Sequence, residues 1–256
     1  MTKEKTMRVA FIGSGKVATQ LALIFRFHGI NITGIFSRNH VSGKALSERL
    51  QCPFVAEPND LDADLIIIAT NDASVRELHT SLKKDTFIVY TAGAVNLADF
   101  PDENWGVFYP LQTFTENRNL TVNEIPILME ANSVELRCAL ESLCEQVGLQ
   151  SDYCGSQDRQ KYHLAAVYVN NFVNHLYHKA QVQLKQNNLD WNMLKPLMEE
   201  TIAKLDDLSA FDAQTGPARR NDQNTIHTHQ SFLNKEEEIV YNVLTNSIQK
   251  TYNNHD

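Results

Sequence analysis

The first 150 residues alternate short apolar runs with amphipathic stretches, and this alternation constrains the fold more than any other feature of the sequence. Short β-branched runs are typical of buried strands, and amphipathic stretches between them are typical of helices that cross over a sheet. Six runs are predicted as strands: 8–12, 31–36, 65–70, 87–91, 105–109 and 125–129. The pattern predicts an α/β domain with a doubly wound parallel sheet.

Stretches 17–28 and 73–82, between these strands, and 134–147, after the last of them, are predicted as helices. The last of them follows Asn132, whose spacing to Glu135 fits a capping box. Gly148 then supplies a stop signal.

After Gly155 the strand-like runs end, and residues 157–254 are predicted as helical segments. Breaks are expected at Asn187-Asn188, around residues 215–217 and near Asn234. We therefore expect two domains, residues 1–154 and 155–256, joined by a short link, with a cleft between them.

Composition excludes several classes of partner. The 256 residues carry a formal net charge of -8, which argues against nucleic acid and against an anionic membrane surface. No apolar run approaches the roughly 18 residues that a membrane span needs. The four cysteines form no CxxC motif, which favours reduced thiols. We expect a cytoplasmic protein.

A glycine-rich turn, Gly13-Ser14-Gly15-Lys16-Val17-Ala18, follows the first predicted strand directly and opens a helix. Gly13 permits the tight turn, Gly15 lets the backbone approach a pyrophosphate, and Ala18 allows close helix–strand packing. The helix N-terminus offers N–H groups and a positive dipole end to phosphates. The turn is therefore predicted to bind a dinucleotide.

The end of the second strand indicates which dinucleotide. An NAD site usually has an acidic residue there, whereas this chain has Ser37-Arg38-Asn39. Ser37 and Arg38 can donate hydrogen bonds to a 2′-phosphate, which a carboxylate would repel. We therefore expect NADP as cofactor. A helix cap at Ser37 and a solvated charge at Arg38 are the alternative interpretations.

Small and polar residues follow further strands, where ligands of open parallel sheets bind. The residues assigned to the cofactor path are Thr70, Asn71, Ala92, Gly93 and Pro110. Ordinary turn chemistry is the alternative.

The predicted helix from about residue 157 to 187 carries a polar stripe that includes His163, Asn170, Asn174 and Gln181. Histidine changes protonation near neutral pH, so His163 is the first candidate for acid–base catalysis, with Tyr109 and Tyr162 as weaker candidates. Asn170 is a candidate for orienting substrate or donating to an oxyanion. A satisfied core histidine and solvated asparagines are the alternative interpretation.

Further residues are candidate substrate contacts, each with a structural loop or solvated surface as the alternative: Gln112, Asn174, Thr215, Gly216 and Arg219.

His227 and His229 stand two residues apart, a spacing that turns them away from each other on a helix. No metal site is predicted.

Four stretches together with the glycine turn carry a family resemblance: "VYTAGA", "GVFYPLQTF", "KYHLAAVYVNNF" and "QTGPARRND". The chain resembles the bacterial Rossmann-like family of candidate NADP oxidoreductases with a helical C-terminal domain of unknown function. Pyrroline-5-carboxylate reductases and β-hydroxyacid dehydrogenases are distant relatives. The resemblance implies a Rossmann domain, a helical domain like the C-terminal domain of 6-phosphogluconate dehydrogenase, NADP, and a homodimer through the helices.

The chain departs from the β-hydroxyacid dehydrogenases at one position. They carry a lysine four residues before an asparagine pair, whereas Ala166 and Val167 precede Asn170-Asn171 here. The leading hypothesis is an NADP(H)-dependent oxidoreductase acting on a small carbonyl, imine or hydroxy compound between the domains. The alternatives are a non-catalytic NADP-binding dimer, acting as a sensor or assembly module, and an enzyme with a deazaflavin as second ligand.

Overall fold

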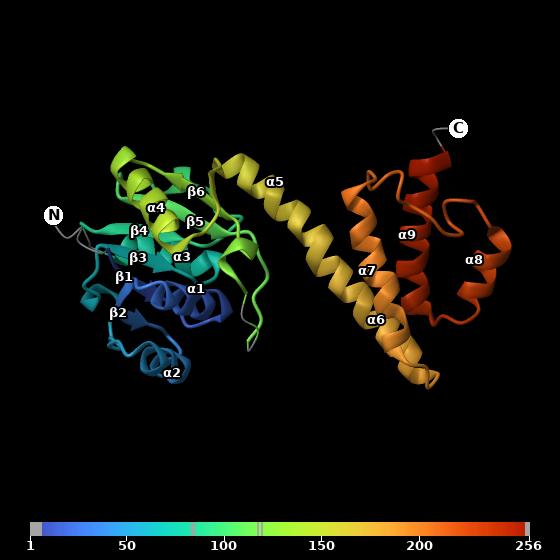
Figure 1. Cartoon of the computed structure of the whole chain (residues 1–256), viewed down its shortest axis with the longest axis horizontal. Coiled ribbons are helices and arrows are strands. Elements are labelled where there is room, and N and C mark those ends of the chain that lie inside the picture. The colour runs from blue at the N-terminus through green and yellow to red at the C-terminus, as the bar shows by residue number, and fades with distance from the viewer. Residues whose placement is uncertain (1–6, 83–84, 117, 119, 254–256) are drawn as a thin grey trace. The chain divides into compact units, whose positions relative to one another are not determined.

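The computed structural model describes residues 7–82, 85–116, 118 and 120–253. Contacts divide the chain into two compact units, unit 1 up to Asn171 and unit 2 from Phe172 onward. Figure 1 labels most of their helices and strands, numbered in chain order.

Unit 1 contains a seven-stranded sheet in the order β2-β1-β3-β4-β5-β6-β7. The strands are β1 (Arg8–Ile12), β2 (Asn31–Phe36), β3 (Leu65–Ile68), β4 (Phe87–Tyr90), β5 (Trp105–Pro110), β6 (Ile127–Ala131) and β7 (Ser151–Tyr153). Neighbouring strands are parallel except for β5 and β6. The chain order reverses beside β1, and a sheet of this kind binds ligands at such a switch point.

Helices cover both faces of the sheet (Figure 1). They are α1 (Lys16–Phe27), α2 (His40–Leu50), α3 (Asp72–Ser81) and α4 (Val134–Val147). The two-residue period of a strand divides the core: Val9 and Phe11 pack in one buried cluster, and Ala10 and Ile12 pack in the other. All four side chains are fully or almost fully buried because helices cover both faces.

The predicted doubly wound sheet is confirmed, but it differs from the prediction in two details. β6 runs antiparallel to β5, and β7 was not predicted. Among the described residues, the connection between β5 and β6 contains no α-helix that could serve as a crossover, which fits an antiparallel pair. Only three residues form β7, and Asp152 and Tyr153 are exposed, so this strand lacks the apolar signal of the others.

The helix α4 has the predicted bounds but a different cap. Ser133 accepts a hydrogen bond from the backbone N–H of Leu136. The side chain of Asn132 instead donates to the carbonyl oxygens of Phe100 and Asp102. Tertiary partners therefore move the cap by one residue, whereas Gly148 ends the helix in the left-handed conformation, as predicted.

The C-terminal part of the chain is helical, as predicted. It contains α5 (Ser156–Ala166), a π-helical segment (Val167–Phe172), α6 (Val173–Gln186), α7 (Lys195–Ala203), α8 (Gln223–Gln230) and α9 (Lys235–Asn253). Short 3₁₀ helices lie at Pro58–Asp60, Leu97–Asp99, Val122–Glu124, Trp191–Leu194 and Lys204–Asp206. The predicted break at Asn187 follows the end of α6.

The last strand ends at Tyr153 and α5 begins at Ser156, whereas contacts divide the chain after Asn171. The domain boundary after residue 154 stays a prediction. Among the residues that the structure describes, no helix is long and apolar enough to cross a membrane.

Candidate functional site

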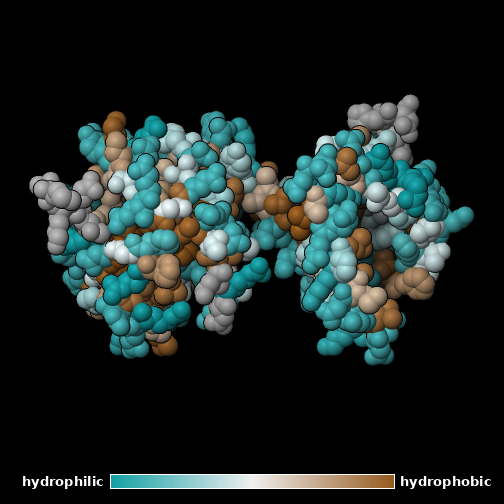
Figure 2. All heavy atoms as spheres, in the orientation of Figure 1, coloured by the Kyte–Doolittle hydropathy of each residue, from teal (hydrophilic) through white to brown (hydrophobic). Residues whose placement is uncertain are grey.

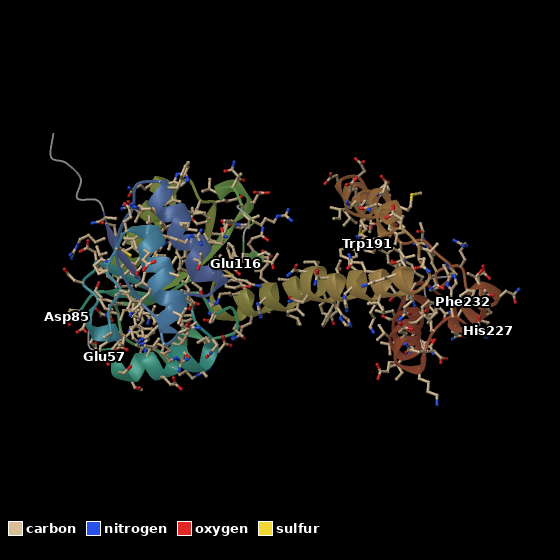
Figure 3. All side chains as sticks on the ribbon, turned by 90° about the horizontal axis from the view of Figure 1, so that it is seen from below. Glu57, Asp85, Glu116, Trp191, His227 and Phe232 are labelled. Atoms are coloured by element: carbon tan, nitrogen blue, oxygen red, sulfur yellow. The ribbon has the colours of Figure 1, made fainter. Side chains whose placement is uncertain are left out.

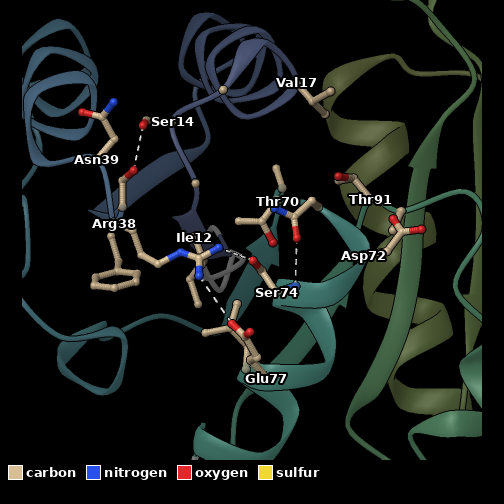
Figure 4. Close-up of a pocket in the computed structure, with 18 of the residues that line it drawn as sticks. Ile12, Ser14, Val17, Arg38, Asn39, Thr70, Asp72, Ser74, Glu77 and Thr91 are labelled. Atoms are coloured by element: carbon tan, nitrogen blue, oxygen red, sulfur yellow. Dashed lines mark hydrogen bonds and ion pairs between the residues drawn. The ribbon is translucent and has the colours of Figure 1, made fainter.

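A pocket of about 840 Å³ opens at the carboxyl ends of β1 to β4 in unit 1 (Figure 4). Most of the predicted cofactor residues and the first candidate for acid–base catalysis line it: Gly13, Ser14, Gly15, Lys16, Val17, Ser37, Arg38, Asn39, Thr70, Asn71, Ala92, Gly93 and His163. The structure therefore brings four predicted loops, those after β1, β2, β3 and β4, to one pocket.

Two glycines give the turn after β1 its shape. Gly13 has a φ of +119°, and its backbone N–H donates to the carbonyl oxygen of Phe36 over 2.8 Å. A Cβ atom on Gly13 would lie 2.4 Å from the backbone oxygen of Ala69, so no larger residue fits. A Cβ atom on Gly15 would meet no atom within 4 Å, because this glycine borders open pocket.

The first turn of α1 is available to an anion. Gly15 occupies the cap position, and α1 has no side-chain cap. Its first N–H groups therefore have no side-chain partner at the cap and, together with the positive end of the helix dipole, suit phosphate oxygens.

Three serine hydroxyls meet beside this turn. The Oγ of Ser14 lies 2.8 Å from the Oγ of Ser37 and 2.7 Å from the Oγ of Ser42. Asn39 caps α2 by accepting from the backbone N–H of Ser42. Ser42 also lines the pocket but was not predicted from the sequence, because a single serine in a helix carries no local signal.

Arg38 contacts the far wall of the pocket. Its Nη1 lies 3.4 Å from a carboxylate oxygen of Glu77, and its Nη2 hydrogen-bonds the hydroxyl of Ser74. Figure 4 shows both contacts to α3. Sequence reasoning identified Arg38 but missed its partners, because nothing local indicates which face of α3 meets the turn after β2.

One buried polar atom at the pocket has no partner. The hydroxyl oxygen of Thr70, just after β3, makes no hydrogen bond in the described structure. Such a group costs free energy unless a ligand or water satisfies it. The neighbouring Asn71 caps α3 by accepting from the backbone N–H of Ser74.

His163 and Tyr109 form a hydrogen-bonded pair that lines this pocket and also an adjoining one. The hydroxyl of Tyr109 lies 3.0 Å from Nδ1 of His163. Burial raises the pKa of Tyr109 above its usual value, although the positive charge of Arg159 opposes the shift. Tyr109 is therefore a neutral phenol at physiological pH that can donate a proton in a hydrogen bond.

Gly93 makes room for this pair. A Cβ atom on Gly93 would lie 2.8 Å from Nδ1 of His163 and 3.0 Å from Cε2 of Tyr109. The turn after β4 thus approaches the pair closely because residue 93 has no side chain.

A second pocket of about 560 Å³ shares Lys16, Val17, Tyr109 and His163 with the first, and it is lined further by Gln112 and Asn170. The predicted uninterrupted α-helix is wrong at this point, because Val167–Phe172 are π-helical. A π-helix turns less per residue than an α-helix, so a wheel drawn at 100° per residue misplaces side chains beyond residue 167. Such segments are frequent at functional sites.

Six predicted residues do not line these two pockets. Ala18 is fully buried and Pro110 is buried at the end of β5. Asn174, Thr215, Gly216 and Arg219 belong to unit 2. Arg219 donates to the carbonyl oxygens of Phe211 and Gln214 and lies 4.7 Å from the ring centre of Tyr252, so it packs within unit 2.

The histidines of α8 take no part in a metal cluster in the described part of the chain, where no group of three metal-ligating side chains was found. Nδ1 of His229 lies 2.9 Å from the hydroxyl of Tyr241. His227 is exposed on α8, and Figure 3 labels it together with Phe232, which follows this helix.

Known proteins with a similar sequence or fold match this chain over most of its length. Residues 125–248 match the family model described as a domain of unknown function, DUF2520. A crystal structure described as a candidate NADP oxidoreductase from Bacteroides fragilis is 31% identical, with a TM-score of 0.89, and the match covers 95% of this chain and 98% of that chain.

Two more distant structures share the fold. A reductive aminase from Aspergillus terreus, crystallised with NADPH, is 14% identical with a TM-score of 0.72, covering 96% of this chain and 95% of that chain. A 1-pyrroline-5-carboxylate reductase from Streptococcus pyogenes is 16% identical with a TM-score of 0.60, covering 95% of this chain and 98% of that chain. No curated protein sequence matches the chain. Together, the Bacteroides relative, the family model and the sheet show that the chain belongs to the family of Rossmann-like proteins with a helical C-terminal DUF2520 domain.

Proposed function

We propose that this protein is an NADPH-dependent oxidoreductase that transfers a hydride to or from a small carbonyl, imine or hydroxy compound. The observation that carries the proposal is the pocket of about 840 Å³ at the sheet's switch point, which the glycine turn, Arg38 and the Tyr109–His163 pair all line. The Bacteroides relative is described as a candidate NADP oxidoreductase, which supports the same cofactor here.

The residues present fit a dinucleotide. Gly15 leaves open the space that a pyrophosphate needs, and the unpartnered hydroxyl of Thr70 can hydrogen-bond a ligand. Ser37, Arg38 and Asn39 would hold a 2′-phosphate through charge-assisted hydrogen bonds. NADPH, when bound, supplies the hydride from its nicotinamide ring.

The Tyr109–His163 pair would handle the proton that accompanies hydride transfer. The phenol of Tyr109 stays protonated, and the imidazole of His163 is within hydrogen-bond distance to return a proton to it. Gln112 and Asn170, on the adjoining pocket, would orient the substrate through their side-chain amides.

Titration of the purified protein with NADPH and NADH tests the cofactor. We expect NADPH to bind more tightly, and equal affinity would contradict the role of Ser37 and Arg38.

In Gly15→Ala, a methyl group enters the open pocket, and we expect NADPH affinity to fall roughly tenfold or more, since a hydrogen bond to a charged group contributes about 1.5–3 kcal/mol.

Gly155→Ala is the matched control. Gly155 caps α5 and also has an extended ψ, and a Cβ atom on it would likewise meet no atom within 4 Å, but it does not line the cofactor pocket. If Gly155→Ala binds NADPH as tightly as the wild type, the loss of NADPH affinity in Gly15→Ala results from the methyl group in the pocket.

NADPH oxidation against carbonyl and imine panels tests catalysis. For any substrate found, His163→Ala and Tyr109→Phe should lower kcat by roughly 10²–10⁴, the range of general acid–base catalysis. NADPH binding should stay within about twofold of the wild type. If both variants turn over at the wild-type rate, the pair is structural.

A non-catalytic NADP-binding role is the second candidate. Ala166 and Val167 line the adjoining pocket at the positions where the pattern of β-hydroxyacid dehydrogenases has a lysine. A protein that binds NADPH tightly but oxidises it with no member of either panel would favour this role.

We further propose that the protein is a homodimer paired through unit 2. Leu197 and Ile202 on α7 are 63% and 65% exposed, and Figure 2 shows hydrophobic residues at the surface of this unit. Closed two-fold pairing is the commonest way to cover such side chains. Light scattering should give twice the monomer mass, and Leu197→Lys with Ile202→Lys should give a monomer; a monomeric wild type contradicts the proposal.

A further inference from the structure

Arg38 and Glu77 form an ion pair between two walls of the cofactor pocket. Arg38 follows β2, and Glu77 lies on α3, and both side chains line the pocket. Their charged atoms are 3.4 Å apart, and the side chains are 65% and 69% exposed. Because water screens this pair, either side chain can exchange its partner for a charged ligand at small cost.

Glu77 is carried by a well-anchored part of α3. Asn71 caps this helix, and Ser74, one turn before Glu77, is buried and hydrogen-bonds the guanidinium of Arg38. Figure 4 shows Ser74 and Glu77 reaching toward Arg38 from the same helix. Glu77 therefore projects from an anchored helix and not from a loop, and its carboxylate lies near the guanidinium of Arg38.

A phosphate and a hydroxyl group would meet this carboxylate differently. A 2′-phosphate held by Arg38 brings negative charge close to Glu77, and like charges at this separation repel even in water. A ribose 2′-hydroxyl, in contrast, can donate a hydrogen bond to a carboxylate, as it does in NAD sites with an acidic residue.

We propose that Glu77 is a specificity-determining residue that holds Arg38 across the pocket and lowers the preference for a 2′-phosphate over a 2′-hydroxyl. This inference rests on the proposed NADPH site. The carboxylate of Glu77 competes with the 2′-phosphate for the guanidinium of Arg38 and repels that phosphate. The 2′-hydroxyl of NADH is not repelled. The site is consequently less selective than the sequence Ser37-Arg38-Asn39 by itself indicates.

The test is the ratio of NADPH to NADH affinity in Glu77→Gln, with 2′,5′-ADP and 5′-AMP as simpler probes of the same group. Removing one negative charge should raise affinity for NADPH and 2′,5′-ADP by about threefold to tenfold at low salt. Affinity for NADH and 5′-AMP should stay the same within about twofold or fall. The gain should shrink at high salt, because the two charges are exposed.

Two further variants separate charge from structure. Glu77→Asp keeps the charge and should stay near the wild type. Glu145→Gln makes the same change in charge at an exposed position of α4, outside the pocket, and should leave the affinity ratio unchanged. Equal melting temperatures exclude a loss of folding as the cause.

The outcomes also distinguish this inference from the proposed function. A wild type that prefers NADPH, with an unchanged ratio in Glu77→Gln, overturns the inference alone. Weaker NADPH binding in Glu77→Gln also overturns it, since Glu77 would then orient Arg38 for the phosphate. A wild type that binds none of the four ligands overturns the proposed function and the inference together.

Discussion

The two units bury apolar side chains to very different extents. In unit 1, α1 buries four apolar residues and α4 buries five, all in the same core cluster. In unit 2, α6 and α7 have no buried residue among those described, and several of their apolar side chains are exposed. The exposed ones include Leu176, Leu197 and Ile202.

This difference shows that the two units reach stability in different ways. A parallel sheet covered on both faces forms a dry core by itself, because each strand contributes side chains to both sides. Amphipathic helices without a sheet must cover one another or be covered by a partner. Unit 1 therefore has the rigid core on which a binding site can be built, while unit 2 has surface that suits association.

The largest effect is expected at the buried ion pair of unit 1. Arg159 is fully buried, and its Nη1 contacts a carboxylate oxygen of Glu130, which is 15% exposed. Its Nη2 also hydrogen-bonds the carbonyl oxygen of Val95 and the hydroxyl of Ser156. Arg159→Met leaves the carboxylate of Glu130 without its cationic partner, and we expect the free energy of unfolding in urea to fall by about 3–5 kcal/mol.

Two variants provide the controls for Arg159→Met. Adding Glu130→Gln removes the unpaired charge and should restore part of the stability. Arg220→Met, at an exposed position of unit 2, should change the free energy by less than about 0.5 kcal/mol. Equal losses in Arg159→Met and Arg220→Met would contradict the contrast between the units.

We expect alkaline pH to lower the free energy of unfolding of unit 1, because all four cysteines lie in this unit. Burial raises the pKa of Cys144 from 9.0 to about 11. The folded state then holds this proton more tightly than the unfolded state, so the free energy of unfolding is unaffected below pH 9 and falls as the pH rises to 11. The fall attributable to Cys144 should be about 3 kcal/mol, at about 1.4 kcal/mol per pKa unit.

Urea unfolding at pH 8, 9, 10 and 11 measures this transition. Cys144→Ala should flatten the decline relative to the wild type, whereas Cys138→Ala, at an exposed position of the same helix, should not. The same slope in Cys144→Ala and the wild type would show that Cys144 ionises freely in the folded protein.

Local signals in the sequence were sufficient for much of unit 1. The glycine turn, the strand before it and the helix after it are adjacent in the chain, so residues 8–27 could be assigned from their order alone. The loops after β2, β3 and β4 could be assigned to one pocket because parallel strands place their carboxyl ends at one edge.

Contacts between distant residues could not be predicted in this way. Arg38 and Glu77 are 39 positions apart, and Tyr109 and His163 are 54 positions apart. Which side chains meet depends on the face that each helix presents after packing. The π-helical segment after Ala166 likewise changes the direction of later side chains without a distinct residue pattern.

The smallest effect is expected from a leucine on the surface of unit 2, and a matched leucine of unit 1 gives the scale. Leu140 on α4 is fully buried, and Leu140→Ala should cost about 2–5 kcal/mol through lost burial and a cavity. Leu197→Ala on the exposed face of α7 should change the free energy of unfolding of a dilute, monomeric sample by less than about 0.5 kcal/mol.

Protein concentration then decides what the exposed leucine does. If a second copy covers α7, the cost of Leu197→Ala should grow with concentration, because association stabilises only the folded wild type. Leu140→Ala should cost the same at every concentration, since its neighbours belong to its own core. A cost at Leu197 that is large even in the dilute monomer would mean that unit 2 closes on itself, and the contrast between the two units would then fail.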